Sequence, residues 1–154
     1  MHYVVGILIV LIAFLSMELV AWLTHKYIMH GFLWSLHKDH HDHSNNSRFE
    51  KNDYFFVIFA IPGILNILFG INDFSAPYFW IGLGITLYGA TYFFIHDLFI
   101  HQRIKILRNT TNPYLLLLRR AHKIHHKSIK KMGGESFGML LFVKYRSNKT
   151  VKEH

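Results

Sequence analysis

The sequence predicts an all-α integral membrane protein, a bundle of three to four membrane helices with a histidine-rich site for two metals on its cytoplasmic side. Three observations predict this fold. Three long apolar segments carry no Lys or Arg, all 17 Lys and Arg lie in two other stretches, and ten of the 13 histidines form a repeated pattern. With 154 residues the chain is long enough for one domain, which we expect to cover residues 1–154.

The first apolar segment covers residues 3–23, which include no Lys or Arg. A helix rises about 1.5 Å per residue, so this segment can cross a hydrocarbon core of about 30 Å. A secretory signal peptide would have a basic start and a small-residue cleavage site. This segment has neither and runs directly into a histidine motif, so we expect it to be a membrane helix.

The second and third apolar segments cover residues 54–70 and 77–100, and residues 71–76 link them. Pro77 suits the first turn of the third helix, where its missing N–H costs nothing. Pro62-Gly63 predicts a kink in the second helix, which a membrane bundle tolerates when neighbouring groups satisfy the freed backbone. Two further apolar runs, at 114–118 and 137–143, are too short to span. Each is expected to be an interfacial or re-entrant piece, or part of a marginal fourth helix.

The charges predict the orientation in the membrane. All Lys and Arg lie in residues 26–51 and 103–152. By the positive-inside rule both stretches are cytoplasmic, so the C-terminus lies inside and the N-terminus and the 71–76 link lie outside. We expect location in the inner (cytoplasmic) membrane. The net charge of +8 is then explained by topology and anionic lipid, and no nucleic-acid partner is expected.

Histidine dominates the polar inventory. The 13 histidines outnumber the nine Asp and Glu residues, and there is no cysteine. The absence of cysteine excludes disulfides, thiolate zinc sites and Cys-ligated iron–sulfur clusters. Ten histidines form a first half, His-x4-His followed by His-x2-His-His, and a second half with the same internal spacings. The first half holds His25, His30, His37, His40 and His41, and the second holds His96, His101, His122, His125 and His126.

Each half starts at the cytoplasmic end of a predicted membrane helix, so the two halves converge on one layer. On an α-helix the three histidines of His-x2-His-His lie at 0°, about 300° and about 40°, on a single face. The two of His-x4-His lie about 140° apart and need not share a metal. Ten imidazoles supply five ligands for each of two metals, whereas a closed zinc site uses four. The pattern therefore favours a two-metal centre, and the membrane context favours iron for oxygen chemistry.

A lone histidine is more often a core or surface residue than a ligand. His2, His43 and His154 fit that description and are not part of the predicted ligand set. For a single member of the set, such as His30 or His101, a role in orienting another ligand stays open.

The residues around the histidines resemble bacterial β-carotene hydroxylases. The boxes alone specify only the wider superfamily of membrane fatty-acid hydroxylases, sterol oxidases and desaturases, and the intervening residues and the small size narrow the resemblance. It covers roughly residues 17–142. The matching runs are residues 25–41, 49–53, 88–103, 121–126 and 136–138.

The resemblance implies a non-haem di-iron monooxygenase. Two irons bind O₂, take two electrons from a reduced ferredoxin-type donor and insert one oxygen atom at C3 of the β-ionone ring. β-Carotene would become β-cryptoxanthin and then zeaxanthin, and zinc can replace iron in a structure. An unactivated C–H bond offers no acid–base handle, so a metal–oxygen species must carry this reaction. The carotenoid, insoluble in water, is expected to arrive from the lipid bilayer.

No catalytic side chain is predicted beyond the metal ligands, and no separate cofactor-binding residue. Glu18, Asp97 and Asn66 are candidates for support. Glu18 would cost roughly 2.5–3.5 kcal/mol facing lipid near the bilayer centre, so it is expected to point inward, either to a ligand histidine or as a paired or protonated packing residue. Asp97 either orients His96 or is a helix-end charge. Glu50 and Asp53 are expected to be capping or interface residues.

Other functions compete with carotenoid 3-hydroxylation. Within enzymes, they are a hydroxylase or desaturase of another lipid and a carotenoid ketolase, although those relatives are usually longer. Outside enzymes, it is a metal-binding or metal-transporting membrane protein. A transporter would place ionisable ligands at the bilayer midplane, whereas this chain places them at the ends of its helices.

Overall fold

The computed structural model describes residues 2–42 and 49–141, and within them all regular structure is helical. His43 and His154 lie outside the described residues, as does the end of the apolar run at 137–143. The described elements are α1 (His2–Leu23), η1 (Thr24–Phe32), α2 (Trp34–His37), η2 (Lys38–His41), α3 (Asp53–Gly70), α4 (Tyr78–Phe93), η3 (Phe94–Ile100) and α5 (Pro113–His126).

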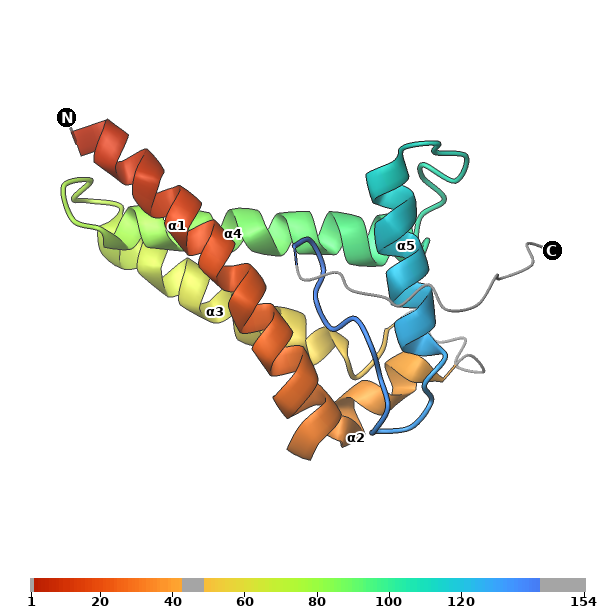
Figure 1. Ribbon diagram of the computed structural model, residues 1–154. Coiled ribbons are helices and arrows are strands. Elements are labelled where there is room, and N and C mark those ends of the chain that lie inside the picture. The colour runs from red at the N-terminus through yellow and green to blue at the C-terminus, as the bar shows by residue number, and fades with distance from the viewer. Residues whose placement is uncertain (1, 43–48, 142–154) are drawn as a thin grey trace.

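Three helical stretches are long and apolar enough to cross a membrane, as the sequence predicts: Tyr3–Phe32, Asp53–Gly70 and Tyr78–Ile100. α3 and α4 form a hairpin, and α1 crosses it at a steep angle (Figure 1). Many apolar side chains face outward along these helices, and Leu11, Ile58 and Leu87 are 52%, 50% and 45% exposed. Such an apolar outer surface suits contact with lipid and is typical of a membrane protein. α3 continues through Pro62 without a break.

Small residues let the three membrane helices approach closely. A Cβ atom added to Gly84 would lie 2.7 Å from the side chain of Ala13 on α1, and one added to Gly82 would lie 2.7 Å from the backbone of Ile67 on α3. Neither approach leaves room for a larger residue, so α4 packs backbone to backbone against both neighbours. Close packing of this kind is a main source of helix association in membranes.

Two membrane helices continue as π-helices at the histidine end. η1 extends α1, and η3 extends α4. The backbone N–H of Leu33 bonds to the Ile28 carbonyl at 3.0 Å, and that of His101 bonds to the His96 carbonyl at 2.9 Å. These i→i+5 bonds widen the helical turn. Residues five apart then lie one above the other, so the 140° separation expected for His-x4-His in an α-helix is wrong here.

α5 begins at a capped N-terminus. The Asn112 side chain accepts hydrogen bonds from the N–H groups of Tyr114 and Leu115, at 3.0 and 3.1 Å, and Pro113 occupies the first turn. At 14 residues α5 measures about 21 Å, too short to cross the bilayer. The described chain therefore has three membrane spans rather than four.

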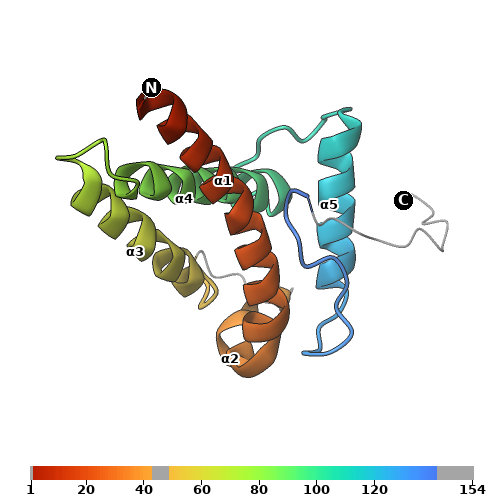
Figure 2. The ribbon, with the colours of Figure 1, turned by 60° about the vertical axis from the view of Figure 1, so that its left-hand side comes forward.

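The packed core lies where α5 meets η3. It consists of Ile95, Phe99, Ile100, Leu118 and Met139. After α5 the chain has no helix or strand over residues 127–141, and we call this stretch the return segment. Figures 1 and 2 show it in blue, folding back from the lower end of α5 and running up between α1 and α5. This path brings the end of the described chain back to the membrane helices.

Candidate metal centre

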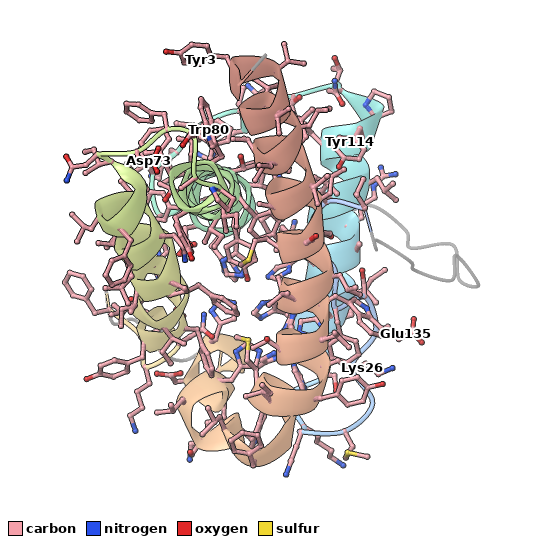
Figure 3. All side chains as sticks on the ribbon, turned by 90° about the vertical axis from the view of Figure 1, so that its left-hand side faces the viewer. Tyr3, Lys26, Asp73, Trp80, Tyr114 and Glu135 are labelled. Atoms are coloured by element: carbon pink, nitrogen blue, oxygen red, sulfur yellow. The ribbon has the colours of Figure 1, made fainter. Side chains whose placement is uncertain are left out.

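The ten predicted histidines gather in one place. Nine are buried and His101 is half-buried. They come from η1, α2, η2, η3 and α5, with His101 directly after η3. Figure 3 shows imidazole nitrogens meeting beside the lower half of α1, on the side of Lys26 and Glu135 and away from Tyr3, Asp73 and Trp80 at the opposite end. The predicted convergence at one end of the membrane helices is therefore seen in the structure.

The histidines divide into two clusters. In cluster A, five ring nitrogens lie within 4.8 Å of one another, and in cluster B four do. His96 adjoins cluster B, because its Nε2 lies 3.1 Å from Nε2 of His40, and we count it as the fifth member. Cluster A holds His25, His30, His37, His41 and His125, and cluster B holds His40, His96, His101, His122 and His126.

The two halves of the sequence exchange one histidine each. His40 comes from the first half but belongs to cluster B, and His125 comes from the second half but belongs to cluster A. The reason lies in helical spacing. His37 and His41 are four residues apart and point the same way, whereas His40 between them points to the neighbouring cluster. Neither half closes a site alone, so each cluster needs the other half.

The outer ring nitrogen of four cluster A histidines is held by a neutral acceptor. An Nδ1–H that donates to such an acceptor leaves Nε2 without a proton and its lone pair pointing inward. Three of the four acceptors are backbone carbonyls of the return segment. The pairs are His25 with the Phe137 carbonyl (3.0 Å), His30 with the Lys131 carbonyl (3.1 Å), His125 with the Glu135 carbonyl (2.9 Å) and His37 with Asn52 Oδ1 (2.7 Å).

Two cluster B histidines are held by carboxylates instead. His40 Nδ1 lies 2.6 Å from Glu50 Oε2, and His96 Nδ1 lies 3.1 Å from Asp97 Oδ2. Arg103 lies between these acids, with its Nε 3.0 Å from Asp97 Oδ1 and its Nη2 3.9 Å from Glu50 Oε2. Burial raises the pKa of Glu50 to about 7, against the opposing effect of Arg103. The orienting groups of cluster B are therefore ionisable carboxyl groups, whereas those of cluster A are neutral carbonyl and amide oxygens.

Three pairs of facing Nε2 atoms indicate whether the clusters can hold metal ions. The Nε2 atoms of His25 and His37 lie 3.2 Å apart, as do those of His30 and His125, and those of His40 and His96 lie 3.1 Å apart. In each pair both rings direct Nδ1 at an outside acceptor, so two lone pairs face each other. Neutral rings in this arrangement cannot hydrogen bond, whereas a cation bound by both satisfies them.

Protonation of one ring does not supply the missing donor in these pairs, because the rings stay neutral. Burial lowers the pKa of His37 to about 2 and that of His125 to about 3, and it also lowers the pKa of His40 well below its usual range. Neutral imidazole is the form that binds transition metals. An all-nitrogen donor set of this kind suits Zn, Cu, Fe or Ni. The donor set therefore fits two metal cations, one in each cluster.

Comparison with known proteins agrees with this site. The fatty acid hydroxylase family model matches residues 10–144. The chain belongs to the fatty acid hydroxylase family. It is 41% identical to a β-carotene hydroxylase of Pantoea ananas, over 91% of this chain and 79% of the relative, and 39% identical to one of Paracoccus sp. (strain PC1), over 86% and 82%. It is also 38% identical to a chloroplastic β-carotene 3-hydroxylase of an Oncidium hybrid cultivar, over 82% of this chain and 41% of that protein.

The resemblance inferred from the histidine boxes is thereby confirmed, and as a member of a hydroxylase family the chain is an oxidoreductase. No solved structure is significantly similar to the chain.

Two of the residues that the sequence suggested as supports of the histidines, Glu18 and Asn66, have other hydrogen-bond partners in the structure. Glu18 is 1% exposed, accepts a hydrogen bond from the Tyr88 hydroxyl at 2.8 Å and contacts the return segment, which fits the alternative of a paired packing residue. The Asn66 amide donates to the Pro62 carbonyl of its own helix at 2.8 Å. Asn66 lies about 20 Å along α3 from Asp53, so the suggestion that it supports the histidines is wrong.

Several orienting groups were missed from the sequence. Glu50 was expected to cap a helix or lie at the interface, yet it holds His40. Asp53 Oδ2 accepts from the Glu50 N–H at 3.1 Å, and its Oδ1 lies 2.6 Å from Arg103 Nη2. The clustering of Glu50 and Asn52 just after the first histidine box was the available signal. The return-segment carbonyls have no side-chain signature, so no motif could have found them.

A cavity adjoins cluster B. Its volume is about 280 Å³. Four of the five cluster B histidines line it, together with one charged residue of α5 and two from the chain between η2 and α3, so it offers a polar approach to that cluster. The lining residues are His40, Asp42, Glu50, Ile100, His101, His122, Lys123 and His126.

Proposed function

We propose that this chain is a β-carotene 3-hydroxylase, an O₂-dependent monooxygenase whose two irons are bound by the ten clustered histidines. The observation that carries the proposal is the set of three facing Nε2 pairs in two adjacent clusters, because that arrangement calls for two cations. The names of the relatives supply the substrate, since those of Pantoea ananas and Paracoccus are β-carotene hydroxylases.

Bound iron supplies the activation of O₂ that an unactivated C–H bond requires. In the overall reaction a C–H bond and O₂ become C–OH and water, with two electrons and two protons consumed. The protein's own residues have two tasks. Outer acceptors hold the Nδ1–H of six of the histidines so that Nε2 faces inward, and burial keeps rings such as those of His37 and His125 neutral.

The site lies where a membrane-borne substrate can reach it. Both π-helical extensions end beside the histidines, and the apolar faces of α1, α3 and α4 continue above them. A hydrocarbon ring at the end of a long polyene would arrive sideways from lipid, and its new hydroxyl would lie near the interface, where water can solvate it. The basic stretches 26–51 and 103–152 favour a cytoplasmic site and C-terminus and an external N-terminus in the inner membrane.

The electrons are proposed to come from a separate reduced ferredoxin. The sequence has no cysteine, so it cannot hold an iron–sulfur cluster on Cys thiolates, and it shows no flavin or haem motif. The basic cytoplasmic stretches would attract an acidic donor. Lipid, carotenoid and this donor are the partners we propose, with no nucleic acid.

The family description favours a second candidate. It names fatty acid hydroxylation, so oxidation of another lipid is the alternative activity. A carotenoid ketolase would oxidise the same β-ionone ring. A non-catalytic metal-binding protein would oxidise neither a carotenoid nor another lipid.

Expression in a bacterium that accumulates β-carotene distinguishes these cases. We expect β-cryptoxanthin and zeaxanthin under air and neither without O₂, with the His37→Ala variant as the inactive control. Keto-carotenoids would show the ring chemistry but contradict 3-hydroxylation. Hydroxylated or newly unsaturated acyl chains beside unchanged carotenoid would leave only the family assignment standing. No product of either kind would contradict an enzyme.

A further inference from the structure

The return segment makes hydrogen bonds to the histidines of cluster A. Its backbone carbonyls accept from three of the five cluster A histidines, at Lys131, Glu135 and Phe137. The Phe137 ring also packs edge-on against these histidines, with ring centroids 5.4 Å from His25 and 5.2 Å from His125. The groups that orient cluster B, Glu50 and Asp97, lie outside the segment. Cluster A therefore depends on where the return segment lies.

Glu18 of α1 fastens the end of that segment. Its Oε1 accepts hydrogen bonds from three consecutive backbone N–H groups, those of Met139 at 3.0 Å, Leu140 at 2.8 Å and Leu141 at 3.0 Å. Three N–H groups converging on one carboxylate oxygen form charge-assisted bonds. Met139 is only two residues after Phe137, so little slack separates the anchored amides from the carbonyl that holds His25.

The location of Glu18 strengthens this anchor. It lies within the membrane-spanning part of α1, where water is scarce and an unsatisfied carboxyl group is costly. The return segment supplies the N–H groups, and Tyr88 of α4 supplies a hydroxyl to Oε2 at 2.8 Å. Removing the segment would take three hydrogen bonds from Oε1 of the acid, and removing the acid would take the acceptor from three consecutive backbone N–H groups. Each therefore stabilises the other in one position.

We propose that Glu18 is a positioning residue for cluster A: it fixes the return segment, whose carbonyls set the ring orientation of His25, His30 and His125. This inference rests on the proposed metal binding. A residue that only packs the membrane helices would affect both clusters alike when changed. A positioning residue acting through the segment affects cluster A and spares cluster B.

The first test measures the anchor without any metal. Hydrogen exchange at the amides of Met139, Leu140 and Leu141 is followed in the metal-free full-length protein in lipid nanodiscs. We expect slow exchange in the wild type and about tenfold or faster exchange in Glu18→Leu, because charge-assisted bonds are lost. Tyr88→Phe, which removes the hydroxyl that donates to Glu18 Oε2, is the matched control, and exchange at the three amides should stay slow in it. Slow exchange in Glu18→Leu would overturn the anchor.

The second test measures the consequence at the metals. Each protein is loaded with ⁵⁷Fe and its iron content and Mössbauer spectrum are recorded, with His125→Ala marking loss at cluster A and His122→Ala marking loss at cluster B. Glu18→Leu should lose or alter the signal that His125→Ala loses, and Glu18→Gln, which keeps one acceptor oxygen, should lie between it and the wild type. An unchanged spectrum, or loss of both signals alike, would overturn the positioning role.

Wild-type protein that binds no iron would contradict the proposed function, and the positioning of a metal cluster with it, whereas the exchange test would still decide the anchor. If Glu18→Leu does not insert, a second pair replaces it. Leu141→Pro deletes one of the three N–H groups, and Leu141→Ala keeps it at the same exposed position. We expect the proline variant alone to speed exchange at residues 139–140 and to alter the cluster A signal. Equal behaviour of the two variants would overturn the proposal.

Discussion

Glu50 Oε2 lies 2.6 Å from His40 Nδ1, so a carboxylate next to α3 holds a histidine of η2 that belongs to cluster B. Its counterpart in cluster A is Asn52, whose neutral amide oxygen lies 2.7 Å from His37 Nδ1. Two residues apart in the sequence, Glu50 and Asn52 thus serve different clusters. A carboxylate makes the ring it holds a stronger electron donor than an amide does. The two proposed irons are therefore expected to be chemically distinct.

The first prediction concerns this carboxylate. Glu50→Gln should weaken metal binding at cluster B by about 10–100-fold while cluster A keeps its metal, because an outer acceptor of a ligand histidine is weakened. Competition with a chelator, followed by iron content, measures the change. The control is Glu135→Gln, which makes the same chemical change at an exposed side chain whose backbone carbonyl, not its carboxylate, contacts His125. Equal metal loss in both variants would contradict a specific role for Glu50.

The second prediction tests the exchange of histidines between the halves. His40→Ala should abolish hydroxylation and lose the same metal as His122→Ala, although His40 lies three residues from His37 in the sequence. His125→Ala should instead lose the same metal as His37→Ala. Iron content and Mössbauer spectra of the four variants, all expected to insert normally, make the comparison. If the variants group by halves of the sequence, with His40 beside His37, the cluster assignment is wrong.

Much of this arrangement could be predicted from the sequence, and the rest depends on contacts that no motif encodes. The three membrane helices follow from apolar length, and the convergence of ten histidines follows from two repeated motifs at helix ends. The exchange of His40 and His125 was not predicted, because helical spacing placed the three histidines of each His-x2-His-His motif on a single face and did not show that the middle one points into the other cluster. The shared side of His25 and His30 was missed because the sequence did not reveal a π-helix.

For Glu18 the sequence predicted the orientation of the side chain but not its partners. Its position in an apolar helix predicted an inward orientation, since exposure to lipid is costly. Three of its partners are backbone N–H groups 121 to 123 residues later in the chain, which carry no sequence signal. Asn66 was assigned a similar role on the same reasoning, yet the Pro62 carbonyl of its own helix satisfies it. A polar residue in a membrane helix needs a partner, but the sequence does not say whether that partner is a ligand.

The third prediction concerns sidedness. A reporter fused after residue 154 should read cytoplasmic, and one inserted within residues 72–75 should read external. The physical reason is that residues 52–102 contain no Lys or Arg whereas residues 103–152 contain most of them. Paired alkaline phosphatase and fluorescent protein fusions measure both positions, because each reporter is active on one side only. A cytoplasmic signal from the 72–75 insertion would move the histidine clusters to the other face of the membrane.

The last prediction concerns the source of the oxygen and of the electrons. The hydroxyl of the product should carry label from ¹⁸O₂ and none from labelled water, because iron bound by neutral imidazoles is proposed to activate O₂ rather than to deliver hydroxide. Turnover by purified protein should require both a reductase and a ferredoxin, since the chain has no cysteine for a cluster of its own.

The donor should also bind through charge. With 13 of the 17 Lys and Arg in residues 103–152, turnover with an acidic ferredoxin should fall as ionic strength rises, because salt screens attraction between the two surfaces. A small neutral reductant gives the control, since its rate should not change with salt. If salt lowers both rates equally, the basic stretch acts on the membrane or on folding rather than on the donor. If label enters the product hydroxyl from water instead of from O₂, the proposed O₂-dependent monooxygenation is contradicted.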